Sequence, residues 1–177
     1  MLWSDVQAIR SAVRDAAPDV NTNRLTDGAI ETLLAAIEHG KARGHKRIEP
    51  EHILLAIATS VRQRVVQHVL KRLGVDLPGM TADVAASLPD NQGSASDGWP
   101  PFGAQTARLF SEAKAESHEL GHNYICSQHL ALGMLRFAPC DAGEVLRRQL
   151  VTIDRFRQEL FAVIGKPKPT SAGPTTG

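Results

Sequence analysis

Hydrophobic side chains recur at helical spacing through most of the chain. Between Leu25 and Ile37, apolar residues recur three and four positions apart, and a similar stripe runs between Leu109 and Leu120. Residues at this spacing share one face of an α-helix. No stretch shows the period-two alternation of a strand, so the pattern predicts an all-α protein.

The helical stripes form two copies of one unit, offset by 77 residues. Gly44-His45 aligns with Gly121-His122, and a one-residue deletion further on keeps the later positions in register. We therefore predict two pseudo-symmetric four-helix repeats and an extra N-terminal helix. The expected organisation is an amphipathic helix and lead-in at 1–24, repeat one at 25–88, a linker at 89–101, repeat two at 102–165, and a disordered tail at 166–177.

Local signals suggest where several helices begin and end. Thr26 is a capping residue at the start of the first repeat, and Pro50 suits the first turn of the next helix. Ser127 is predicted to cap the corresponding helix of the second repeat. Gly40 and Gly44 are expected to end the helix that Thr26 caps, and a short fourth helix is expected around 81–88.

Composition and charge exclude several classes of protein. The 177 residues are 42% hydrophobic and carry a formal charge of +1, which gives no general attraction for nucleic acid or membrane. The short basic runs at 41–47 and Arg147-Arg148 are expected to be solvated surface. No signal peptide and no apolar run long enough for a membrane span are evident. The two cysteines, Cys126 and Cys140, do not suggest a disulfide framework, so we expect a cytoplasmic protein with reduced thiols.

The segment "FGAQTARLFSEAKAESHELGHNYICSQHLALGML", together with "VLKRLGVD" in the first unit, resembles the N-terminal repeat of Clp-family unfoldase ATPases. The resemblance covers roughly residues 25–165. It implies a double four-helix repeat with pseudo-twofold symmetry. In that family the domain performs no chemistry; it docks adaptors, substrates and certain cyclic peptides, and it is tethered to ATPase modules.

The sequence contains no Gly-x-x-x-x-Gly-Lys-Ser/Thr phosphate loop. We therefore expect a free-standing, non-enzymatic N-domain without cofactor, acting as an adaptor, regulator or decoy. Its expected partners are Clp ATPase or protease components, adaptors or substrate proteins, with cyclic peptides as further ligands. The alternatives are an independent stress-related or small-molecule sequestering protein without a Clp partner, and an enzyme whose pocket the sequence does not reveal.

The resemblance points to candidate binding residues at the start of the second helix of each repeat. A Thr-Glu pair there can recognise phosphorylated arginine in the family, through a hydroxyl and a carboxylate. In this chain the pair is replaced by Pro50-Glu51 in the first repeat and Ser127-Gln128 in the second. Each copy keeps half of the pair, so we do not expect phosphoarginine binding, and helix capping is the simpler interpretation.

A second candidate surface follows the linker. Trp99 and Phe102 place two aromatic side chains at the entry to the second repeat, and the family's counterpart of Phe102 lies near a surface that cyclic peptides use. Aromatic side chains are effective interface anchors. A basic family residue is replaced by Ala107, with Arg108 beside it. Packing of Phe102 on its own helix is the alternative.

Four histidines occupy equivalent places in the two repeats: His45, His52, His122 and His129. A metal site or a catalytic pair would need further ligands or an orienting group that the pattern does not supply. We predict that the imidazoles are structural and satisfy a backbone carbonyl where the loop meets the helix. A nucleophilic pairing of Cys126 with a histidine lacks an oxyanion hole and is not expected.

Overall fold

The computed structural model describes residues 2–88, 98–137 and 139–165, and within these ranges the regular secondary structure is helical. The predicted tail and most of the predicted linker lie outside them. The all-α prediction is confirmed. The elements are α1 (Trp3–Ala16), η1 (Thr22–Arg24), α2 (Asp27–Ala42), α3 (Pro50–Thr59), α4 (Arg64–Arg72), α5 (Leu77–Ser87), α6 (Ala104–Glu119), α7 (Ser127–Arg136), α8 (Asp141–Arg148) and α9 (Ile153–Ile164).

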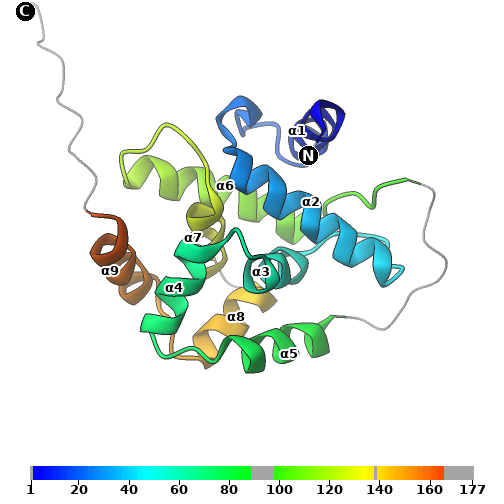
Figure 1. Ribbon diagram of the computed structural model, residues 1–177. Coiled ribbons are helices and arrows are strands. Elements are labelled where there is room, and N and C mark those ends of the chain that lie inside the picture. Colours follow the sequence, from blue (N-terminus) through cyan, green and yellow to red (C-terminus); the bar gives the residue numbers. More distant parts are fainter. Residues whose placement is uncertain (1, 89–97, 138, 166–177) are drawn as a thin grey trace, which may run out of the picture.

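The helices of the two repeats correspond in order, and their lengths agree to within one residue. Both ends of α2 and α6 are 77 residues apart, and the same holds for α3 and α7. Helix α8 is one residue shorter than α4, which is where the sequence predicted a deletion. In Figure 1, α3 and α7 lie inside the molecule, with the other helices around them. The predicted pair of four-helix units is therefore present.

Several predicted helix boundaries are correct, but not all of them are. The Thr26 side chain accepts a hydrogen bond from the Ala29 N–H at the start of α2, and Pro50 occupies the first turn of α3. Helix α2 runs through Gly40, whose missing side chain leaves room for Ile48, and it ends at Ala42, just before Gly44 with its φ of 66°. Helix α5 begins before 81–88, because the Asp76 side chain caps its start.

Apolar burial is densest in α3 and α7 and continues through both repeats. The extra helix α1 joins this core through Val6, Ile9 and Val13, which are buried against the body. It contacts α2 and α6, the first helices of the two repeats. The N-terminal helix therefore rests on both units rather than on the first alone (Figure 1).

The turn between α8 and α9 contains a strained residue. Gly74, between α4 and α5, has a φ of 86°, and its counterpart in the second repeat is Leu150, with a φ of 59°. Only glycine reaches this left-handed region without steric cost. The Leu150 side chain is 72% exposed, so it gains little from packing.

Replacing Leu150 with glycine is expected to raise the free energy of unfolding by about 0.5–1 kcal/mol. Relief of the left-handed strain, roughly 1–2 kcal/mol, exceeds the entropy that glycine adds to the unfolded chain. Urea unfolding followed by circular dichroism measures the change. The matched control, Gly74→Ala, should destabilise the protein; a stabilising Gly74→Ala or a destabilising Leu150→Gly contradicts this account.

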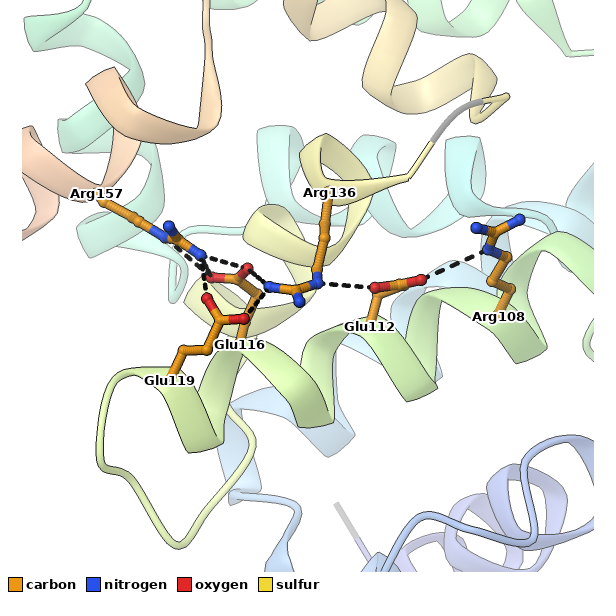
Figure 2. Close-up of polar contacts among 6 residues, drawn as sticks. All are labelled: Arg108, Glu112, Glu116, Glu119, Arg136 and Arg157. Carbon is orange, nitrogen blue, oxygen red and sulfur yellow. Dashed lines mark hydrogen bonds and ion pairs between the residues drawn. The ribbon is translucent and has the colours of Figure 1, made fainter.

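An ion cluster centred on the buried Glu116 joins three helices of the second repeat (Figure 2). Glu116 of α6 has no exposed surface, and its carboxylate lies 2.7 Å from Arg136 of α7 and 2.6 Å from Arg157 of α9. Glu119 binds both arginines at the edge of the cluster, and Glu112 contacts Arg136 at 2.9 Å. A buried carboxylate of this kind requires such partners, because an unpaired charge in the interior is strongly unfavourable.

The ion cluster is not a feature of the repeat itself. The positions of Glu116 and Arg136 correspond to His39 and Thr59 in the first repeat, where the His39 ring and the Thr59 hydroxyl are 3.3 Å apart. A neutral hydrogen bond thus takes the place of the ion pair. The two halves share a backbone plan but hold their helices together with different chemistry.

Candidate binding site at the repeat junctions

Short backbone bridges connect the two repeats in a reciprocal way. Leu25, which precedes α2, pairs with Ile125 in the loop before α7, and Phe102, which precedes α6, pairs with Ile48 in the loop before α3. These four residues are two equivalent pairs under the 77-residue offset. Each repeat therefore contributes its first segment to the loop of the other, which is what a pseudo-twofold axis requires. The result is two junctions of the same construction.

A pair of histidines stabilises the loop at each junction. The rings of His45 and His52 are linked by a contact of 2.7 Å between Nδ1 and Nε2, and those of His122 and His129 by a contact of 2.9 Å between the same atoms. His52 and His129 are buried. The predicted structural role for the histidines agrees with this geometry. Their main backbone partner is an N–H group, however, and not the predicted carbonyl.

The hydrogen bonds of His129 fix its tautomer. Its Nδ1 accepts from the Cys126 N–H at 3.0 Å, so the ring proton lies on Nε2 and is donated to His122. In the first repeat the Glu49 N–H makes the same 3.0 Å bond to His52. Burial lowers the pKa of His52 and of His129 to about 4, with the neighbouring histidine adding to the effect. Both rings are neutral at physiological pH.

The first junction, formed by Leu25 and Ile125, contains an open cavity of about 210 Å³. It lies where the start of α2, the segment before α4 and the start of α7 meet. Its polar and small lining residues come from both repeats: Thr26, Gly28, Glu31, Arg62, Gln63, Cys126, Ser127 and Gln128. Val65 and Val66 complete the wall.

Two predicted binding residues, Ser127 and Gln128, line the cavity of the first junction. The prediction that Ser127 caps α7 is wrong. Ser127 is the first residue of α7, and Cys126 holds the capping position. The Ser127 hydroxyl is buried and lies 3.2 Å from the Thr32 hydroxyl and 3.3 Å from the Gly28 carbonyl. It therefore connects the repeats, while the half-buried Gln128 remains available to a ligand.

The second junction is formed by Ile48 and Phe102. Glu51 occupies there the position equivalent to Gln128 at the first junction. Glu51 is only 5% exposed, and its Oε1 atom has no hydrogen-bond partner among the described residues. Burial raises the pKa of Glu51, and the nearby Asp141 and Glu49 act in the same direction. Cys140 is buried there, and burial raises the pKa of its thiol to about 11. The carboxylate is thus withdrawn from the surface.

The other predicted binding residues lie apart from the open cavity. Phe102 is 9% exposed and packs edge-to-face on Phe110 with ring centroids 5.0 Å apart, so it offers little surface to a partner. Trp99 is half-buried against the core. Arg108 lies over the Phe137 ring at 4.9 Å and contacts a glutamate of its own helix.

Neither a cluster of metal ligands nor a membrane-spanning helix is found within the described residues. No group of three or more His, Cys, Asp or Glu side chains within them could hold a metal ion. None of the helices in these ranges has the length and apolarity to span a bilayer. Cys126 lies 3.1 Å from the His129 ring, but burial raises the pKa of its thiol, which disfavours the reactive thiolate.

Sequence reasoning missed the first-repeat half of the cavity. Gln63 donates to the Gly28 carbonyl at 3.1 Å, and Arg62 forms an ion pair with Glu31 at the cavity rim. Neither residue belongs to a motif. The only available signal was the repeat itself, because a twofold arrangement brings the segment before α4 to the loop of the other copy.

Comparison with known proteins identifies the relatives of this chain. A family model described as the Clp repeat (R) N-terminal domain matches residues 24–149. A ClpA homolog from Guillardia theta, described as an ATP-dependent Clp protease ATP-binding subunit, is 29% identical over 156 residues. The match covers 87% of this chain but 19% of that relative, so the chain spans less than a fifth of its length.

Solved structures of low sequence identity share the fold. The Hsp104 N-terminal domain from Candida albicans has a TM-score of 0.66 at 18% identity, with 80% of this chain and 92% of that one covered. The N-domain of ClpV from Vibrio cholerae has a TM-score of 0.67 at 17% identity, with 92% of both chains covered.

Proposed function

Because the chain belongs to the Clp N-terminal domain family, we propose that it is a non-catalytic module that binds proteins or peptides. It acts as an adaptor, regulator or decoy for the Clp protease system. The observation that supports this proposal is the preformed cavity at the first junction, to which both repeats contribute polar groups. Helix starts and the Ser127 contacts hold its lining in place, and a rigid lining lowers the entropy lost on binding.

The size of the cavity favours a macromolecular partner over a sequestered small molecule. Its volume of about 210 Å³ is below the roughly 300–1,000 Å³ typical of sites that enclose drug-sized ligands. A protein partner needs to insert only one or two side chains and can make its remaining contacts on the surrounding surface. The cavity at the first junction is therefore too small to enclose a ligand of that size.

Neither junction suits phosphoarginine. At the first, the Ser127 hydroxyl is already bound to groups of the first repeat, and no carboxylate stands at position 128. At the second, Pro50 has no hydroxyl and Glu51 is withdrawn from the surface. We therefore expect a ligand bound through neutral polar contacts around Gln128.

The test is direct binding of the purified chain to purified Clp ATPase and protease components from the same organism, measured by biolayer interferometry. Binding of at least one component is expected. Gln128→Arg should weaken it about tenfold, or ~1.4 kcal/mol, because it places a charge in the cavity. The matched control, Gln7→Arg, makes the same change at an exposed position of α1 and should leave binding unchanged.

Two results would contradict the proposal. One is the absence of binding to every Clp component, together with a rise in melting temperature on addition of a cyclic peptide, which supports the sequestering alternative. The other is an equal loss of binding in both variants, which would place the contact away from the first junction.

A further inference from the structure

All the exposed side chains of α4 are basic or histidine. They are Arg64, His68, Lys71 and Arg72, while the apolar residues of the helix point into the core. Figure 1 shows α4 next to α9. The whole chain has a formal charge of only +1, so this face departs from the average surface.

Ion pairs within the chain neutralise only part of the positive charge on α4. Arg72 binds Glu159 of α9 at 2.6 Å. Arg64 donates to the Val61 carbonyl, and among the described residues no carboxylate forms an ion pair with Arg64 or Lys71. The helix dipole favours cations in the last turn, where Lys71 and Arg72 lie, but it disfavours Arg64 in the first turn. Arg64 is thus not placed there for helix stability.

The face is hollowed as well as charged. Val61, Arg64, Gln67, His68 and Lys71 line a surface depression of about 480 Å³. The Gln67 amide donates to carbonyls at the end of α3, including that of Ile57 at 2.8 Å, which fixes this part of the floor. Arg64, His68 and Lys71 follow the i, i+4, i+7 spacing of one helix face, so they extend about 10 Å along it.

The second repeat shows that the fold does not require a basic helix at this place. Its equivalent helix, α8, exposes Asp141 and Glu144 in its first half. Its two arginines, Arg147 and Arg148, are paired with Glu144 at 3.1 and 3.6 Å. The charges on this helix are therefore balanced in the second repeat, whereas the exposed face of its equivalent in the first repeat is uniformly basic.

We propose that the α4 face, formed by Val61, Arg64, His68 and Lys71, is a docking surface for an acidic segment of a partner protein. Carboxylates one to two helical turns apart match the spacing of the cations, and Val61, 78% exposed, offers an apolar contact. The inference rests on the proposed protein-binding function but concerns a different surface from the first junction. Such an interface binds weakly and depends strongly on salt.

The probe is a fluorescein-labelled peptide with glutamates at i, i+4 and i+7, and fluorescence anisotropy with the full chain measures its binding. Saturable binding is expected at low salt, weakened about tenfold when NaCl rises from about 50 to 300 mM. The double variant Arg64→Gln/Lys71→Gln should bind about tenfold more weakly. The double variant Arg147→Gln/Arg148→Gln removes the same net charge from α8 and should bind like the parent chain.

Three outcomes would overturn the proposal: no saturable binding at low salt, equal effects of the two double variants, or equal binding of the glutamine version of the peptide. A fourth is tighter binding of a poly-uridine oligonucleotide of the same charge with the same dependence on Arg64 and Lys71, which would assign the face to nucleic acid. If the peptide does not bind but Gln128→Arg weakens binding of a Clp component, the α4 docking surface is contradicted and the proposed function is not.

Discussion

Replacing Glu116 with alanine is expected to lower the free energy of unfolding by about 3 kcal/mol, the usual cost of breaking a buried ion pair. Glu116 is fully buried, and its carboxylate neutralises Arg136 and Arg157 where α6, α7 and α9 meet. Its removal leaves two guanidinium groups with less compensation and a cavity in the second repeat. Thermal unfolding should show a fall in melting temperature of roughly 6–12 °C.

The control for this experiment lies one helical turn away. Glu119 binds the same two arginines, but its side chain is 46% exposed. Solvent screening keeps exposed pairs weak, so Glu119→Ala should cost less than about 1 kcal/mol. Equal losses in the two variants would show that burial of the Glu116 carboxylate has no special importance.

Acidification is expected to destabilise the protein through the paired histidines. The pKa of His52 and of His129 is about 4 in the folded protein and 6.5 in the unfolded chain. Between these values the unfolded state binds more protons, so stability present above pH 6.5 is lost as the pH falls towards 4. The loss between pH 7 and 5 should be about 2 kcal/mol for each histidine.

Urea unfolding at several pH values measures this effect, and His129→Gln isolates it. Glu49 and Glu51 have raised pKa values, so protonating them on acidification favours the folded state and partly offsets the histidine loss. The carboxyl contribution is shared by the parent chain and the variant. The variant should therefore lose the His129 share of the slope, about 2 kcal/mol between pH 7 and 5; parallel curves for the two proteins would falsify the assignment.

The helices could be predicted because local signals and tertiary packing agree. Apolar spacing located each helix, and Thr26 and Pro50 marked two helix starts correctly. The repeat was visible because equivalent loops carry the same Gly-His pattern. Local reasoning failed at Ser127, since Cys126 takes the capping position and the Ser127 hydroxyl bonds to the other repeat.

The candidate site was only partly predictable. Ser127 and Gln128 were identified by resemblance, but Arg62 and Gln63 reach the same cavity only through the reciprocal arrangement of the repeats. The partners of Glu116 are likewise distant in sequence. Periodicity shows that a residue faces inward without showing which side chain it will meet there, so contacts of this kind need coordinates.

The exchanged bridges make the two halves interdependent for folding. An isolated unit would leave the Ile48 or Ile125 loop without the neighbouring backbone that it pairs with here, and it would expose these buried isoleucine side chains to water. A chain carrying one unit could regain these contacts by pairing with a second copy of itself. Gene duplication and fusion would convert that bimolecular assembly into a unimolecular one, whose integrity no longer depends on the concentration of subunits in the cell.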